Sequence, residues 1–376
     1  MSECYIKKMK KIALFIPLIL SFFITKTYAT EEFYIDAEEI IKQNKEVKYK
    51  EELMVEYNDI EYTTKYVEDE NFPTGLIVVK IQGREGSSRK ITVKKYENEN
   101  VLAEEVKKES ELSVPVNKVV VVGVGKDKYN YKARKGDSVR VFGTNVYLYS
   151  EPNRNSEKGK SVTIGSNVRI LEVLDNWYKV QYGKNEGYIE SICTYSEDYL
   201  NPEKIPVNEL TKNLRFDMDL NKKSNLTLEQ FQKILSNEKY DKKGVMAANA
   251  ECFYYAEQQY GLNGVFLAAV AVHESNWGQS KIANDKKNLF GYGASDSNPY
   301  GNAGVFENYA EGIDLVARVF VKYYINAPGT IIYDGTAASG KYYHGSNLSG
   351  VNVKYASDKN WANGVFKWMK ILYGSL

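Results

Sequence analysis

The chain has 376 residues, more than one hydrophobic core usually supports, so several domains are expected. The composition is that of a soluble globular protein, with 31 tyrosines as the one clear excess, and 50 basic residues nearly balance 49 acidic ones. Because so even a balance is poorly suited to gripping phosphate backbones, nucleic acid is excluded as an expected partner.

Residues 1–29 have the pattern of a secretory signal peptide. Lysines precede an apolar run at 12–24, and residues 27–29 supply the small-residue end where cleavage is expected. A transmembrane anchor is the alternative, but thirteen apolar residues are too few to cross a bilayer comfortably. Cleavage leaves 45 basic and 48 acidic residues and two cysteines. The mature chain is therefore expected to be exported, without a stable membrane anchor or a disulfide framework.

Residues 30–50 are charged and patternless, which predicts a linker. Residues 51–126 indicate an all-β domain, because short β-branched runs at 77–79, 91–93 and 119–122 are separated by charged or glycine-containing stretches. The glycines that punctuate this segment are Gly75, Gly83, Gly86, Gly123 and Gly125. Their arrangement resembles the G5 domain of bacterial wall-associated proteins. The resemblance implies adhesion or binding of N-acetylglucosamine polymers, and a spacer without a ligand is the alternative.

Residues 138–197 show a second, compact β pattern. Four runs rich in β-branched and aromatic residues are candidate strands: 139–142, 146–149, 168–173 and 178–182. Three segments resemble a bacterial SH3-like domain: 145–152, 176–180 and 187–189. This resemblance implies docking on cell-wall peptide stems. Core packing is the preferred interpretation of Trp177, Tyr147 and Tyr149, and a ligand groove is the alternative.

Residues 198–206 indicate a second linker, and the pattern then becomes helical to the end of the chain. Thr227, with Gln230 three residues later, forms a capping-box signature before an apolar stripe. Four further helices are predicted: 244–260 with Gly261 as its stop, 265–275, 311–325, and one after Asp358 as N-cap that carries Trp361, Val365, Trp368 and Leu372 and ends at Gly374. With a polar, glycine-rich middle at 288–308, these helices indicate an α+β, lysozyme-like domain over 207–376.

The stretch 265–278 combines an uninterrupted apolar run, 265–272, with a carboxylate close to its end. Small residues within the run and an Asn-Gly pair in front of it favour a helix buried on nearly all sides. Glu274 would then lie where a core helix reaches the surface, and desolvation beside an aromatic residue would raise its pKa. A raised carboxyl pKa suits a general acid near neutral pH, so Glu274 is the leading catalytic candidate.

Several segments in this region resemble, in order, the glucosaminidases of glycoside hydrolase family 73: 273–280, 282–283, 288–293, 296–299, 354–358 and 361–362. The resemblance implies a secreted or wall-associated peptidoglycan hydrolase that cleaves the bond after N-acetylglucosamine and needs no cofactor or metal. Its expected partners are glycan strands and peptide stems. Glu274 matches the family's acid. Tyr355 matches a tyrosine near the cleft that would hydrogen-bond the substrate's acetamido group.

The second catalytic group stays open at this point. Glycosidases usually pair two acids, although some use the substrate's acetamido group instead. Glu307 resembles the second acid proposed for some relatives, and Asp296 lies in the same polar segment, although its Ser-Asn-Pro context is typical of a turn. Phe290 and Tyr292 are candidate sugar platforms, with core packing as the alternative for Phe290. Trp277 is included in the expected substrate-binding set, although its main expected effect is to pack beside Glu274 and desolvate it.

The expected architecture is multidomain: N-terminal all-β modules, G5-like and then an SH3-like barrel, followed by an α+β, mainly helical, lysozyme-like catalytic domain. A Cys–His peptidase or metal amidase is disfavoured, since His273 and His344 are the only histidines and no pair has metal-ligand spacing. The rival functions are a muramidase or lytic transglycosylase that uses the same glutamate, and a non-catalytic wall-binding or adhesion protein.

Overall fold

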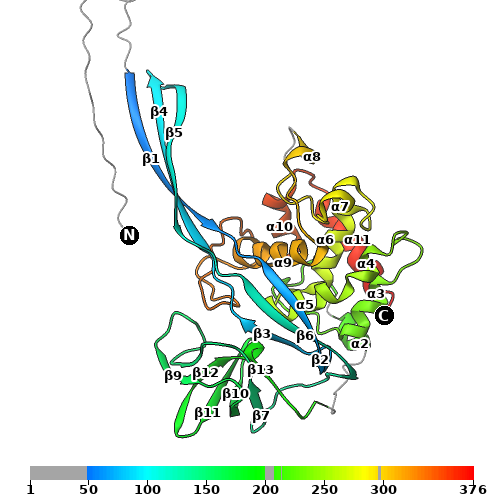
Figure 1. Ribbon diagram of the computed structural model, residues 1–376. Helices are drawn as coiled ribbons and strands as arrows, with labels where there is room; N and C mark the ends of the chain where they lie inside the picture. The colour runs from blue at the N-terminus through cyan, green and yellow to red at the C-terminus, as the bar shows by residue number, and fades with distance from the viewer. Residues whose placement is uncertain (1–48, 200–206, 213, 295–297) are drawn as a thin grey trace, which may run out of the picture. The chain divides into compact units, whose positions relative to one another are not determined.

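The structure of the protein is a computed structural model that describes residues 49–199, 207–212, 214–294 and 298–376 (Figure 1). The predicted signal peptide, most of both linkers and Asp296 lie outside these residues. The chain divides into two compact units. Of the described residues, 49–61 and 85–115 form the first unit, and the rest form the second. No helix within the described ranges is long and apolar enough to cross a membrane.

The first unit is a three-stranded antiparallel sheet in the order β1-β4-β5, from β1 (Tyr49–Ile60), β4 (Gly86–Glu97) and β5 (Asn100–Ser113). Asn98 adopts a positive φ of 58° in the β4–β5 turn, a conformation that asparagine tolerates better than most residues. The predicted linker at 30–50 is wrong at its end, because β1 already starts at Tyr49. Tyr49 pairs with Glu97 across the sheet and donates a hydrogen bond to its carboxylate at 3.0 Å.

A second three-stranded sheet belongs to the second unit and has the order β2-β6-β3. It contains β2 (Thr64–Thr74), β3 (Ile77–Ile81) and β6 (Lys118–Lys128), with β2 parallel and β3 antiparallel to β6. The β-branched runs form its buried centre, since Val78, Val79 and Val120 are fully buried. Residues 51–126 are thus all-β as predicted, but their strands form two separate sheets, one in each unit.

Residues 138–195 form a seven-stranded antiparallel sheet in the order β13-β7-β10-β11-β12-β8-β9. Its strands are β7 (Ser138–Val141), β8 (Val146–Tyr149), β9 (Lys158–Val162), β10 (Asn167–Val173), β11 (Trp177–Tyr182), β12 (Asn185–Glu190) and β13 (Thr194–Tyr195), with a short 3₁₀ turn η1 (Ser191–Cys193). The strand order ends at β13 and β9 without a pairing that closes it, so the SH3-like barrel stays a prediction. Trp177 and Tyr149 are buried and meet edge to face at 5.5 Å, as the core interpretation predicts, whereas Tyr147 is half-buried.

The remainder of the second unit is mainly helical. The elements are α2 (Val207–Lys212), α3 (Leu228–Leu235), α4 (Val245–Ala248), α5 (Ala250–Tyr260), α6 (Gly264–Ser275), α7 (Lys281–Lys286), α8 (Pro299–Asn302), α9 (Tyr309–Val319), a π-helical turn η2 (Phe320–Tyr324), α10 (Leu348–Tyr355) and α11 (Trp361–Tyr373). The predicted capping box is present: Thr227 accepts from the backbone N–H of Gln230, whose side chain bonds back to Thr227. The N-cap of α11 is Asn360, two residues after the predicted Asp358, whose carboxylate accepts from the Asn360 N–H.

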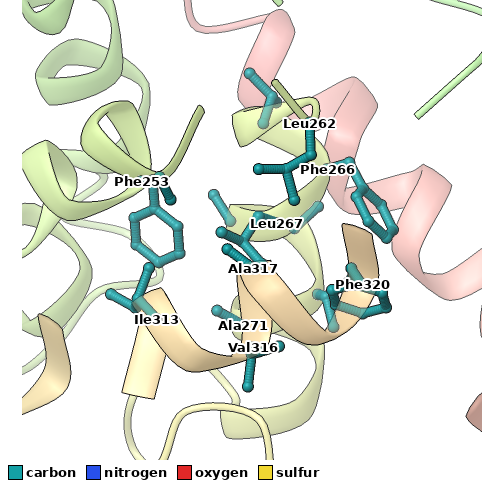
Figure 2. Packing of buried hydrophobic residues seen from close by; sticks show 14 of the residues in the cluster. Phe253, Leu262, Phe266, Leu267, Ala271, Ile313, Val316, Ala317 and Phe320 are labelled. Carbon is teal, nitrogen blue, oxygen red and sulfur yellow. The ribbon is translucent and has the colours of Figure 1, made fainter. Parts of the chain in front are cut away.

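Helix α6 is the centre of this helical core (Figure 2). Asn263 caps its first turn by accepting from the Phe266 N–H at 2.8 Å, and residues 264–272 are all buried. Phe266 meets Phe320 edge to face at 5.1 Å, and α6 also packs against α5 and α11. Full burial of side chains such as Phe266 and Leu267 stabilises the fold by about 1.5–3 kcal/mol each. The predicted all-round burial of this helix is therefore confirmed.

A buried polar network links β2 to α5 and α9 inside the second unit. The carboxylate of Asp314 on α9 is 1% exposed and accepts four hydrogen bonds. The donors are Thr64 Oγ1 at 2.8 Å, Tyr66 OH at 3.1 Å, Tyr260 OH at 2.5 Å and Arg318 Nε at 3.2 Å. Buried charges are tolerated when paired and hydrogen-bonded in this way, so this network fixes the β2–β6–β3 sheet against the helices.

Candidate active site

Glu274 lies in the last turn of α6, where the chain makes a strained reversal. Asn276, Trp277 and Gly278 all have positive φ values, of 50°, 59° and 71°. For a tryptophan this conformation is rare and costs about 1–3 kcal/mol. Ser275 stabilises the turn, since its hydroxyl donates to the Ala271 carbonyl and accepts from the Gly278 N–H. The helix therefore ends one residue after Glu274.

Burial of Trp277 holds this reversal in place. Its ring is 1% exposed, stacks on Tyr240 at 5.5 Å and meets the edge of Trp368 at 5.8 Å. Membership of Trp277 in the substrate-binding set is corrected here, because a ring that is 1% exposed has no free surface for a sugar, whereas its expected packing beside Glu274 agrees with this burial. Phe290 is buried in the helical core, which agrees with the core-packing alternative and not with a sugar platform.

The Glu274 side chain is open to solvent on one side and bonded to the protein on the other. Its Oε1 accepts a hydrogen bond from the indole Nε1 of Trp361, on α11, at 2.7 Å. Surrounding protein removes enough water to raise the carboxyl pKa above its usual range, while the Trp361 bond and the neighbouring His273 lower it. The His273 ring is half-buried against Gly364, where an added Cβ would lie only 2.6 Å from it. The environment predicted for an acid catalyst is therefore present at Glu274.

Tyr355, at the end of α10, belongs to the same group of side chains. Its ring lies 4.9 Å from the ring of Trp361 and stacks on Phe320 at 5.1 Å. Burial, followed by the charge of Glu274, raises the pKa of Tyr355 well above its ordinary value. Its hydroxyl therefore stays protonated at physiological pH and remains available as a hydrogen-bond donor.

A group of tyrosines continues from Tyr355; we call Tyr292, Tyr323, Tyr324 and Tyr342 the tyrosine row. Tyr324 lies 5.7 Å from Tyr355 and 5.0 Å from Tyr342, which in turn is 6.2 Å from Tyr323. Burial, and then the neighbouring Tyr342 and Tyr292, raise the pKa of Tyr324 to about 12. The π-helical turn η2 supplies Tyr323 and Tyr324, closed by the Ile325 N–H bonding to the Phe320 carbonyl at 3.0 Å. Such turns are frequent at functional sites.

A buried asparagine holds the loop that carries Tyr292. Asn288 is 1% exposed, accepts from the Phe290 and Tyr292 N–H groups, and donates to the carbonyls of Tyr292 and Gly304. This explains the segment 288–293: its asparagine folds the loop, its phenylalanine anchors it in the core, and its tyrosine is left partly exposed.

The structure describes one of the two candidates for a second acid. Glu307 is exposed immediately before the N-cap of α9, and its backbone N–H donates to Glu311 at 2.9 Å. Asp296 lies outside the described residues. Within the described part of the chain, no group of three or more His, Cys, Asp or Glu side chains could hold a metal ion. Cys193 and Cys252 are buried free thiols.

Sequence reasoning missed Trp361 and three members of the tyrosine row. Trp361 and Tyr323 lie within two of the predicted amphipathic helices, where an aromatic side chain normally means core packing. The excess of tyrosine in the chain does not identify positions, and the family resemblance at 361–362 gives no role for Trp361. Only the chain's folding over long distances brings Trp361 to Glu274, 87 residues before it.

Comparison with known proteins identifies two segments. Residues 250–374 match the glucosaminidase family described as mannosyl-glycoprotein endo-beta-N-acetylglucosaminidase, and residues 51–125 match the G5 domain. A Streptococcus pneumoniae protein named as an endo-beta-N-acetylglucosaminidase is 34% identical over 152 residues, covering 39% of this chain and 20% of that protein. A Bacillus subtilis beta-N-acetylglucosaminidase is 24% identical over 146 residues, which cover 36% of this chain and 15% of that protein.

Among solved structures, autolysin E of Staphylococcus aureus is 21% identical, with 48% of this chain and 82% of that chain covered and a TM-score of 0.31. The chain spans only about a fifth of the length of the pneumococcal relative, so the sequence similarity applies to the matched segments alone. On those matches, residues 250–374 are similar to the glucosaminidase family, and residues 51–125, which precede them in sequence, are similar to the G5 domain.

Proposed function

We propose that this protein is an endo-β-N-acetylglucosaminidase that cleaves peptidoglycan after N-acetylglucosamine, with Glu274 as the general acid. The observation that best supports this proposal concerns Glu274, which lies at the end of a buried helix. Its carboxyl group is accessible to solvent, yet surrounding protein raises its pKa. Such a group retains its proton at higher pH than an ordinary glutamate. It protonates the leaving oxygen while an oxocarbenium-like centre forms on the sugar.

The side chains beside Glu274 favour substrate assistance for the second half of the reaction. Tyr355 lies next to Trp361 and keeps its proton, so its hydroxyl is suited to orient the acetamido group as that group closes on the anomeric carbon. The alternative is a second acid, Glu307 or Asp296, that directs a water molecule. Glu307 is exposed immediately before the N-cap of α9, and a variant at this position separates the two routes.

The tyrosine row is suited to hold the glycan strand. Its rings are partly exposed and begin beside Tyr355, whereas the buried Phe290 and Trp277 have no free faces. An aromatic face stacks on a pyranose ring, so successive tyrosines would carry successive sugars. Of the predicted platforms, Tyr292 remains in this role.

The β segments are proposed to hold the enzyme on the cell wall after export. This assignment combines the predicted signal peptide, the G5 match and the SH3-like resemblance of residues 138–197, which implies binding of peptide stems. Attachment would raise the effective concentration of the catalytic domain at its polymeric substrate.

The test uses the mature protein and a Glu274→Gln variant, each incubated with purified cell walls. Turbidity is followed, and the reducing-end sugar of the soluble fragments is then identified. We expect the parent to clear walls and leave N-acetylglucosamine ends, and the variant to leave walls intact. Muramic acid ends, or the anhydro form, would point to a muramidase or lytic transglycosylase. Sedimentation of both proteins with intact walls would point to a binding protein.

A Glu307→Gln variant separates the two routes for the second step. Full activity of this variant would show that the second step does not need Glu307, which supports assistance by the acetamido group. Loss of activity in a folded variant would instead support the two-acid route, with Glu307 directing water.

A further inference from the structure

Trp361 makes a hydrogen bond to Glu274 that can run in one direction only. The indole Nε1 is a donor without acceptor capacity, and it lies 2.7 Å from Oε1 of the carboxyl group. Trp361 is 2% exposed at the first position of α11. The buried indole therefore donates its one polar hydrogen to the carboxyl group of the proposed general acid.

Packing fixes the direction of the indole N–H. The Trp361 ring lies 4.9 Å from Tyr355, which stacks on Phe320. The backbone N–H of Trp361 bonds to the Asp358 carbonyl at 3.2 Å, which ties down the start of the helix. A donor held this rigidly selects one rotamer of the carboxyl group that it contacts.

We propose that Trp361 is the positioning residue of the catalytic acid, because its N–H occupies Oε1 and thereby places the catalytic proton on Oε2. In a protonated carboxyl group, the oxygen without the proton is the better acceptor. An indole N–H on Oε1 therefore favours the form in which Oε2 carries the proton. This inference rests on the proposed role of Glu274 as general acid.

The same bond also affects when the acid gives up its proton. A hydrogen bond to a carboxylate favours its charged form, so Trp361 opposes the effect of burial on Glu274. Two titratable groups are electrostatically coupled to Glu274: His273 on α6 lowers the pKa of Glu274, and Tyr355 on α10 has its own pKa raised by the charge of Glu274. Both remain when Trp361 is changed, so loss of the indole donor should raise the pKa of Glu274 further.

The experiment compares Trp361→Phe with Trp368→Phe in the mature protein. Trp368 lies on the same helix, with its ring 5.3 Å from Tyr240 and 5.8 Å from Trp277, so it serves as a matched control. The readouts are the pH profile of wall clearing and the pKa of the Glu274 carboxyl group from carbon NMR. A variant with benzothienylalanine at position 361 keeps the ring shape without the N–H, and it covers the case in which Trp361→Phe fails to fold.

We expect loss of the indole donor to lower the maximal rate about tenfold, move the alkaline limb of the profile to higher pH and raise the pKa of Glu274. Trp368→Phe should leave the limb and the pKa unchanged. A folded donor-free variant with an unchanged Glu274 pKa would overturn the proposal. If the parent does not clear walls, the proposed function fails, but the NMR comparison still decides whether Trp361 controls the carboxyl group.

Discussion

Replacing Asp314 by asparagine tests the buried network most directly. Asp314 and Arg318 are paired at 3.2 Å with side chains only 1% and 3% exposed. The substitution removes the negative charge and replaces one acceptor oxygen by an NH₂ group. That NH₂ would face donors on Thr64 and Arg318, or on Tyr66 and Tyr260, depending on the amide orientation.

The expected loss is large because little water reaches this pair. Removing one partner of a buried ion pair costs about 3–5 kcal/mol. The chain also offers a matched control with the same i,i+4 spacing on a helix, since Lys281 and Asp285 pair at 3.6 Å with side chains 73% and 44% exposed. Loss of that pair should cost only about 0.3–0.5 kcal/mol.

Urea unfolding followed by tryptophan fluorescence measures the difference, since Trp277, Trp361 and Trp368 all report on the helical part. We expect Asp314→Asn to lower the midpoint by on the order of 1 M or more, and Asp285→Asn to change it barely. Added salt should weaken the exposed pair and leave the buried one largely unaffected. Equal midpoint shifts for the two variants would refute the assignment of Asp314 as a stabilising contact between β2 and the helices.

Three further predictions concern the site itself. Burial raises the folded-state pKa of Glu274, so the stability it contributes is present below the unfolded pKa and is lost as pH rises through the folded pKa. As pH rises from the unfolded pKa of Glu274 through its folded pKa, the unfolding free energy of Glu274→Gln should therefore rise relative to that of the parent. A difference that does not change with pH would contradict a pKa raised by burial. Gly364→Ala would place a Cβ 2.6 Å from His273 and shift the residue beside the acid, so wall clearing should fall at least about tenfold while circular dichroism stays native. Tyr342→Ala should raise KM for soluble glycan fragments about threefold to tenfold with kcat nearly unchanged, and a fall in kcat alone would remove it from the binding role.

The local elements of this protein were determined by its sequence, because caps and periodicity act over a few residues. The Asn-Gly pair before the apolar run starts α6, and the run itself leaves this helix no solvated face. Thr227 and Gln230 form the predicted capping box, and Gly261 ends α5 with a positive φ. The position of Glu274 follows directly from these rules, since a carboxylate two residues past a buried run must lie at the end of a core helix.

Tertiary structure alone decided which aromatic side chains serve the site. Phe290, Trp277 and Tyr292 look alike to any rule based on composition, yet two are buried and one is partly exposed. Trp361 and Glu274 are 87 residues apart, and no local pattern encodes their contact. The division of residues 51–126 into two sheets is likewise a matter of strand pairing. Periodicity reports how one element is buried, whereas the identity of its neighbour depends on how all the buried faces pack together.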